Sequence, residues 1–257
     1  MRTIPSRLPE MRSLFALLLI AASLACGAAE PRRYAVLSLI GDRLFLSQHI
    51  PAAGERAEDN LRQDVHLEDA TLEKTSLAAV DEALKRANPQ SKPVLLFAQD
   101  GRIYTAQDRV LDEGGNSLHM LDYVRGLLMG QDVTHLILVT KLRQPARIQL
   151  ARSVVGSGTL EGLGYYIEPT PPPDAKGQPT GVGFIAPFAY FKVTLVDLAT
   201  STIVKEERVT ASNAPADAQF STGSNPWASL PAERKVQLLQ GMIRAEMARI
   251  IPRIVRQ

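Results

Sequence analysis

The chain has 257 residues, of which 45% are hydrophobic and 22% charged, close to ordinary globular usage. Its formal net charge is +2, which Arg2, Arg7, Arg12 and Glu10 together supply, so the chain beyond residue 29 is neutral overall. Nucleic-acid binding, which needs a clustered basic face, is therefore not expected. The single cysteine, Cys26, excludes an internal disulfide framework and any paired-cysteine metal motif.

The opening residues have the order of a secretory signal peptide. Arg12 precedes the apolar stretch Leu14–Ala25 (LFALLLIAASLA), and the small residues Cys26–Ala29 follow. The apolar stretch is shorter than the roughly 20 residues that span a bilayer, which favours a cleaved segment over a permanent membrane helix. We therefore expect residues 1–29 to be a signal peptide, with Met11 as an alternative start.

Two processing routes stay open for the exported chain. Cleavage after Ala29 would place Gly27 and Ala29 at the small-residue positions and leave no cysteine. In the other route Cys26 would be a lipid-anchored N-terminus, with Leu24 one place later than the bacterial lipoprotein pattern prefers. The predicted location is the periplasm or the exterior, or the membrane surface through Cys26.

The first elements after this segment are two β-prone stretches, Tyr34–Ile40 (YAVLSLI) and Arg43–Gln48 (RLFLSQ). Gly41-Asp42 between them predicts a two-residue hairpin turn. Residues 51–69 are polar without a clear period and are predicted as loop or irregular strand. Pro93–Ala98 (PVLLFA) is predicted as a short buried strand.

Two helices are expected before residue 131. The first has Thr75/Ser76 as its N-cap and ends before Pro89. The second is capped by Ser117 and stops at Gly130. The intervening stretch, Gly101–Asn116, is predicted as a loop with an edge strand at Arg102–Thr105. The two apolar helix faces are Leu77, Val80, Leu84 and Ala87, and Leu118, Leu121, Val124 and Leu128.

From His135 onward the pattern changes to strands, several of which alternate polar and apolar residues, as strands with one solvated face do. Gln144–Ala146 and Ala199–Ser201 are short enough to be hairpin connections. A final amphipathic helix has Pro231 in its first turn and a bent or frayed end at Pro252. The predicted strands are His135–Arg143, Arg147–Val155, Gly164–Glu168, Ala189–Leu198 and Thr202–Thr210, and the last helical face is Val236, Leu239, Ile243, Met247, Ile250 and Ile254.

This element order favours an α+β fold: a mixed, largely antiparallel sheet with two or three helices packed on it, on one face. Residues 30–257 are expected to form a single α+β domain. A Pro/Gly-rich stretch at 169–183 (PTPPPDAKGQPTGVG) is too polar to pack as core and is predicted as an extended hairpin tip.

Aromatic residues flank this tip and allow two interpretations. Tyr165, Tyr166, Phe184 and Phe188 either pack as the core of the sheet, or form an exposed surface that contacts a protein partner or a membrane. The sequence alone favours core packing and leaves the second interpretation open.

Few residues indicate catalytic chemistry. Gly41-Asp42-Arg43-Leu44 partly resembles the Gly-Asp-Ser-Leu block of SGNH-type esterases, but a guanidinium at the nucleophile position cannot attack an acyl group. A hydrolase would have to assemble its site from Asp42, His49 and His135. We assign no catalytic, cofactor-binding or metal-binding residue, and no small-molecule cofactor is indicated.

The strand-turn-strand Phe191–Val209, with Val196-Asp197-Leu198-Ala199-Thr200 at its turn, resembles a hairpin of the CsgG-like and TolB N-terminal-like periplasmic α/β folds, in which Gly stands where Ser201 is here. His135–Val139 and the closing helix fit the same element order. The Tyr34–Leu44 region resembles uncharacterised exported proteobacterial proteins. These resemblances imply a cell-envelope protein and transfer no catalytic residue. The sequence thus predicts a non-enzymatic binding or assembly module of the envelope; the alternative is a periplasmic hydrolase.

Overall fold

In the computed structural model of the chain, a ten-stranded mixed sheet carries four α-helices among the described residues. The structure describes residues 32–50, 60–67, 69–98, 100–113, 117–169, 182–215, 219–220 and 226–256, and residues 33–257 form one unit. The elements in chain order are β1 (Tyr34–Ser38), β2 (Arg43–Gln48), β3 (Leu61–His66), α2 (Thr71–Ala87), β4 (Val94–Leu96), α3 (Gly101–Asp112), η1 (Ser117–Met120), α4 (Leu121–Leu128), β5 (His135–Lys141), β6 (Arg143–Pro145), β7 (Ile148–Gln149), β8 (Val154–Val155), β9 (Thr159–Glu168), β10 (Gly183–Asp197), β11 (Thr202–Ser212), β12 (Gln219–Phe220), η3 (Pro226–Ser229) and α5 (Ala232–Val255).

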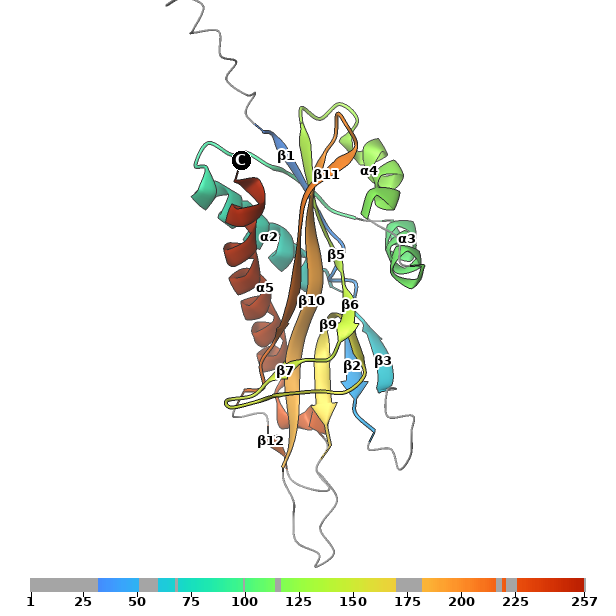
Figure 1. The fold of residues 1–257 in the computed structure, drawn as a ribbon, viewed down its shortest axis with the longest axis vertical. Helices are drawn as coiled ribbons and strands as arrows, with labels where there is room; N and C mark the ends of the chain where they lie inside the picture. The colour runs from blue at the N-terminus through green and yellow to red at the C-terminus, as the bar shows by residue number, and fades with distance from the viewer. Residues whose placement is uncertain are drawn as a thin grey trace, which may run out of the picture. The chain divides into compact units, whose positions relative to one another are not determined.

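Strand β10 is the axis of the sheet, because two strands meet end to end along one of its edges (Figure 1). β9 pairs antiparallel with Phe184–Tyr190, and β5 pairs antiparallel with Phe191–Asp197. β11 pairs along the other edge. Beyond β5 the sheet continues through β1 to β4, and beyond β9 through β2 to β3. We call the place where these two branches separate, around Asp42, Lys141 and Gly162, the fork.

The hairpin predicted for Tyr34–Ile40 and Arg43–Gln48 is wrong. β1 pairs with β4 and β5, whereas β2 pairs with β3 and β9. β1 and β2 run in the same direction, because each is parallel to a strand that is antiparallel to β10. Gly41-Asp42 therefore carries the chain from one branch of the sheet to the other instead of reversing it.

The loop predicted over Gly101–Asn116, with an edge strand at Arg102–Thr105, is also wrong, because α3 occupies most of it. The Asp100 side chain caps this helix by accepting the Arg102 N–H at 2.9 Å. Ile103 and Ala106 are its buried apolar residues. Val110 packs partly buried against the same core, so Ile103, Ala106 and Val110 have a helical spacing that the loop prediction missed.

Other boundaries differ from the prediction for local reasons. α2 begins at Thr71, where Asp69 accepts the Thr71 N–H, so Thr75 and Ser76 are buried inside the helix and do not cap it. Arg147–Val155 holds two short strands, β7 and β8, which pair with each other. The predicted hairpin through Gln144–Ala146 is therefore wrong. β3 gives the region 51–69 a regular strand.

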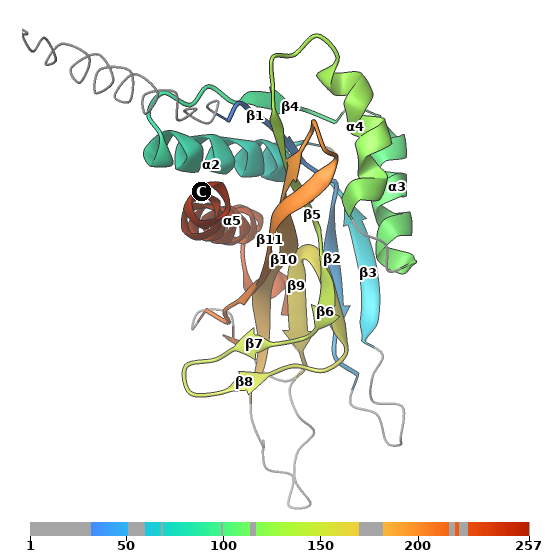
Figure 2. The ribbon, with the colours of Figure 1, turned by 45° about the horizontal axis from the view of Figure 1, so that its top comes forward.

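Helices cover both faces of the sheet, with α2 and α5 on one face and α3 and α4 on the other (Figure 2). The alternating residues of the central strands belong to two separate cores: Val193 and Leu195 pack with α2 and α5, whereas Val196 packs with α3 and α4. The expectation of helices on one face, and of a solvated face along β10, is therefore wrong. A third core lies under β6–β8 and includes Phe45 and Ile148.

The α+β class and the mixed sheet are confirmed. Gly130 follows the end of α4 with a φ of 78°, as a helix stop does. The predicted face of α5 is buried from Leu239 to Ile254, but Val236 is exposed and Lys235 is buried in its stead. α5 continues through Pro252 to Val255. Within the described residues, no helix is long and apolar enough to cross a membrane.

The aromatic residues beside the tip are core residues. Tyr165, Tyr166 and Phe188 are fully buried, and Phe184 is partly buried against Tyr166. They are held by the pairing of β9 with β10, which turns their rings into the sheet's two faces. They therefore do not form an exposed docking surface. The predictions about Cys26, Met11 and most of the tip at 169–183 lie outside the described residues.

The predicted β10–β11 hairpin around Ala199–Ser201 is confirmed. Asp197 accepts the Ala199 and Thr200 N–H groups, and the Thr200 bond in particular holds the pKa of Asp197 below its ordinary value. Ser201 adopts a φ of 54°, a left-handed conformation that is costly for any residue with a Cβ.

We expect Ser201→Gly to raise the free energy of unfolding by about 0.5 kcal/mol, because glycine takes this conformation without strain. The gain is limited by loss of the exposed hydrogen bond that Arg125 donates to Ser201. Urea unfolding measures the change. Thr200→Gly is the matched control. The φ of Thr200 is not left-handed, so glycine at this position should lower the free energy of unfolding. Equal effects of the two substitutions would contradict the strain argument.

Candidate functional site

The fork gathers charged side chains from three segments of the chain. Asp42 and Arg43 follow the carboxyl end of β1, Lys141 is the last residue of β5, and Asp108 comes from α3. β1 and β5 are parallel, and the carboxyl ends of parallel strands are where functional groups of α/β sheets commonly meet. The fork is therefore a candidate site.

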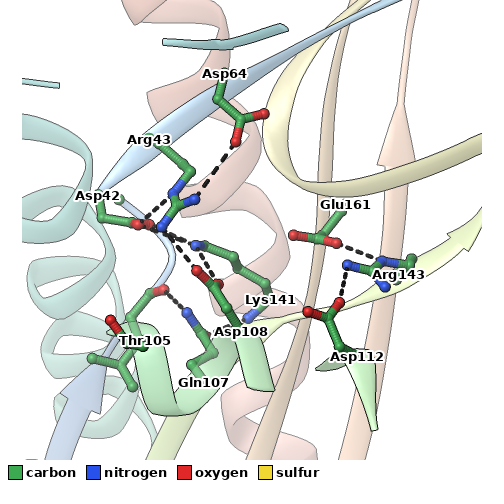
Figure 3. Close-up of polar contacts among 12 residues, drawn as sticks. Asp42, Arg43, Asp64, Thr105, Gln107, Asp108, Asp112, Lys141, Arg143 and Glu161 are labelled. Atoms are coloured by element: carbon green, nitrogen blue, oxygen red, sulfur yellow. Dashed lines mark hydrogen bonds and ion pairs between the residues drawn. The ribbon is translucent and has the colours of Figure 1, made fainter. Parts of the chain in front are cut away.

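Lys141 is the centre of this cluster and is completely buried (Figure 3). Its Nζ lies 2.9 Å from Asp42 Oδ1 and 3.3 Å from Asp108 Oδ1. Its backbone N–H donates to the Gln107 side chain at 2.9 Å, and Gln107 in turn donates to the Leu39 carbonyl at 2.9 Å. A buried ammonium needs such partners, because burial removes its water.

Arg43 bridges the same two carboxylates from the outer side. Its guanidinium donates to Asp42 and to Asp108, each at 2.8 Å, and lies 3.5 Å from Asp64 of β3 (Figure 3). Asp42 and Asp108 are therefore each shared between a lysine and an arginine. The planar guanidinium group gives directional, charge-assisted hydrogen bonds to carboxylates.

A second set of ion pairs lies beside the first. Arg143 of β6 donates to Glu161 of β9 at 2.6 Å and to Asp112 of α3 at 2.9 Å. Arg62 of β3 contacts Glu161 at 3.2 Å and Asp64 at 3.3 Å. Through Arg62 and Asp64 the two sets form one network, which we call the fork network. Its members are Asp42, Arg43, Arg62, Asp64, Asp108, Asp112, Lys141, Arg143 and Glu161.

Glu73 of α2 is buried next to this network. It accepts the Gly41 N–H at 2.7 Å, while its Oε1 has no hydrogen-bond partner among the described residues. Burial raises the pKa of Glu73. The Ser38 hydroxyl and the Gly41 N–H oppose the rise, and the neighbouring Asp42 carboxylate adds to it. A Cβ on Gly41 would lie 2.4 Å from the Glu73 backbone nitrogen, so only glycine lets α2 approach this closely.

The contacts of the fork network are all between opposite charges. They join β2 and β3 of one branch to β5 of the other branch and to α3. The network therefore connects the two branches at the point where the sheet divides. Nucleophilic catalysis by a lysine requires a neutral amine beside a reactive partner, and Lys141 instead faces two carboxylates. We interpret this network as structural.

The three residues of the alternative hydrolase are not brought together. Asp42 lies at the fork, whereas His49 follows the far end of β2 and His135 begins β5. At about 3.3 Å per residue, each histidine is roughly 20 Å from the fork, in opposite directions along the sheet. His135 Nδ1 lies 2.8 Å from the Thr134 hydroxyl. Nothing in this arrangement favours a hydrolase.

His49 belongs to a separate polar chain. Its Nδ1 lies 2.7 Å from Glu168 Oε1, and Tyr166 donates to the other oxygen of Glu168 at 2.8 Å. Burial raises the pKa of Tyr166, and its bond to Glu168 adds to the rise. This row of hydrogen-bonded side chains connects the end of β2 to β9. Within the described ranges, no group of three His, Cys, Asp or Glu side chains is placed to hold a metal ion.

Sequence reasoning missed the fork network, although one signal was present. Because side chains alternate along a strand, Lys141 lies on the same face of β5 as Ile137 and Val139, which are core residues. A charged residue on the core-facing side of a strand indicates a buried ion pair. Its partners come from residues 33 and 99 positions away in the sequence, which no local pattern reveals.

Comparisons with known proteins add little. No family model matches the chain, and no curated protein matches it. Among solved structures, it is similar to the crystal structure of a Xanthomonas campestris protein described with the family model DUF330, at a TM-score of 0.35 and 9% identity over 88% of each chain. A likeness at this TM-score carries no argument about function. The resemblance to CsgG-like and TolB N-terminal-like folds stays a prediction.

Proposed function

We propose that this chain is an exported cell-envelope protein that acts by binding a protein partner. Export is supported by the charged, apolar and small-residue order of residues 12–29. Release into the periplasm and attachment through Cys26 are both compatible with it. The observation that carries the binding role is an exposed apolar groove beside β4, one of the edge strands among the described strands of the sheet.

The groove lies between the end of β4, the start of α3 and α4. It encloses about 220 Å³ and is lined by Phe97, Ala98, Ile103, Tyr123 and Leu127, with Asp100 at one side. Three of these residues are large and substantially exposed: Phe97 at 40%, Tyr123 at 48% and Leu127 at 44%. Single exposed apolar residues are common, but a group of them around a hollow is typical of a contact surface.

The adjoining strand offers backbone groups to the same partner. β4 is the last strand of its branch and pairs only with β1 among the described strands. The outer edge of such a strand can take up an extended segment of another protein, with alternate side chains entering nearby pockets. We therefore propose as occupant an extended segment of a partner protein that places a large apolar side chain in the groove. Asp100 and Arg102 are paired with each other at 2.6 Å, so they leave no strong charge preference there.

Site-specific photo-crosslinking in exporting cells tests this proposal. A photoreactive residue at Phe97 or Leu127 should give one discrete product of the same mass, whereas Val204 and Val236, which are exposed to a similar degree on β11 and α5, should not give it. With the partner isolated, Phe97→Asp should weaken its affinity more than tenfold, and Val204→Asp should leave it unchanged. A product with twice the mass of the chain, or equal labelling from all four positions, would overturn the proposal.

A further inference from the structure

A second cavity lies on the opposite side of the fork from α2, between α3, η1 and the strands β5, β6, β10 and β11. Its volume is about 170 Å³, and α3 and η1 supply an apolar wall that includes Val110 and Met120. This volume is below that of the pockets that hold drug-sized ligands and suits a single small group. The polar wall of the cavity, opposite α3, is the part that suggests a ligand.

Three polar side chains of this wall lie in one row across adjacent strands. Lys192 of β10 is directly opposite Thr140 of β5 on one side and Arg208 of β11 on the other. Directly opposite residues of antiparallel strands project from the same face, a few ångströms apart. All three line the cavity, as does Arg143 from β6.

The Thr140 hydroxyl is the most informative member of the row. Thr140 is 4% exposed, and its Oγ1 has no hydrogen-bond partner among the described residues. A buried hydroxyl left unsatisfied costs stability, so such a group calls for an explanation. Since Thr140 lines the cavity, a ligand there with an acceptor oxygen would satisfy it.

The charges around the cavity favour a negative ligand. Lys141, Arg143, Lys192 and Arg208 line it, and the described lining residues include no acidic side chain. Lys192 and Arg208 share a single carboxylate, Glu206, which lies 3.4 Å from each. Lys141 and Arg143 are already paired within the fork network, so the positive charge left for a ligand is that of Lys192 and Arg208, which have one neighbouring carboxylate between them among the described residues. The Arg208 side chain is 64% exposed and can move to meet it.

We infer that this cavity binds one phosphate group, held by the Thr140 hydroxyl, the Lys192 ammonium and the Arg208 guanidinium. The three donors lie side by side on adjacent strands, and a phosphate offers more acceptor oxygens to such a row than the two of a carboxylate. The phosphate belongs either to a small soluble molecule or to a lipid headgroup. The site is independent of the β4–α4 groove, which is lined by different residues.

Isothermal titration of the purified protein with inorganic phosphate tests the inference, and acetate in parallel measures the preference over a carboxylate. We expect saturable one-to-one phosphate binding that Thr140→Val and Lys192→Met each weaken about tenfold, since each removes one donor to a charged group. Arg152→Gln is the matched control: it removes a positive charge from an exposed position outside the cavity and should leave affinity unchanged. Urea unfolding of each variant checks that it remains folded.

A second arm, with phosphatidic acid vesicles, separates the two sources. Vesicle binding that requires Thr140 and Lys192 and is displaced by phosphate would assign the site to a lipid headgroup. Phosphate binding without vesicle binding would assign it to a soluble molecule. Absence of saturable binding in both arms, or binding that Thr140→Val and Lys192→Met leave intact, would overturn the inference.

Discussion

Gly164→Ala should lower the free energy of unfolding by more than about 3 kcal/mol, among the largest effects of any single methyl group in this chain. Gly164 of β9 lies between Phe45 of β2 and Phe188 of β10. A Cβ at this position would lie 1.9 Å from the Phe45 carbonyl oxygen and 2.7 Å from the Phe188 ring. The first contact is with backbone, which no side-chain rotation relieves, so β2 would have to move away from β9.

Urea unfolding followed by circular dichroism measures this loss, and Gly241→Ala is the matched control. Gly241 lies inside α5 with nothing near the place of its Cβ. Alanine there should stabilise the protein by about 0.5–1 kcal/mol, because glycine is a poor helix former. If Gly164→Ala unfolded at the same urea concentration as the unmodified protein, the close pairing of β2 with β9 would be wrong.

The features predictable from sequence are those with a local signature. The β10–β11 hairpin follows from two alternating runs around a short connection. The stop at Gly130 follows from the presence of a glycine after the apolar helix face, because glycine readily adopts the left-handed φ that the structure has there. The buried face of α5 follows from apolar residues at helical spacing, such as Leu239, Ile243 and Met247. Each of these features depends on residues that are close to one another in the sequence, within one helix or one hairpin.

The division of the sheet has no local signature. Gly41-Asp42 satisfies the pattern of a hairpin turn, yet β1 and β2 do not pair with each other. Besides the nearer strands β4 and β3, they pair with β5 and β9, which lie about a hundred residues away or more. β10 carries polar residues such as Lys192 and Thr194 at alternate positions, which resembles a strand with a solvated face. Instead, α3 and η1 cover that face, together with the neighbouring strands. Tertiary packing decides both features, and it overrides the pattern of the strand itself.

The candidate sites were harder to predict than the fold. The fork network draws Asp42, Asp108 and Lys141 from three separate segments, and the phosphate cavity draws on Thr140, Lys192 and Arg208. Each residue by itself reads as an ordinary surface or strand residue. Only the register between β5, β10 and β11 brings the second set together.

Lys141→Met should lower the free energy of unfolding by about 3 kcal/mol, because it removes one partner from a buried ion pair and leaves carboxylates without compensation. Arg43 still contacts Asp42 and Asp108 at 2.8 Å, which keeps the expected loss at the lower end for a buried pair. Methionine retains most of the length of the lysine side chain without its charge, so the loss reports mainly on the ion pairs. Urea unfolding measures it, and Lys85→Met, which breaks an exposed pair with Asp81, should cost no more than about 0.5 kcal/mol.

A double-mutant cycle separates the charge effect from packing. Asp42→Asn combined with Lys141→Met removes the stranded carboxylate together with its cation, so the double variant should be more stable than the sum of the single losses predicts, by at least about 1 kcal/mol. The same cycle between Lys141 and Asp81, which is remote from the fork, should be additive. Additivity at Asp42 as well would mean that the Asp42–Lys141 contact does not stabilise the fold, and that Lys141 acts through Asp108 or by packing beneath Phe45, to whose ring its Nζ lies 5.7 Å. The two branches of the sheet would then be held together by strand pairing with β10 and by the other ion pairs of the fork network, without help from the Asp42–Lys141 contact.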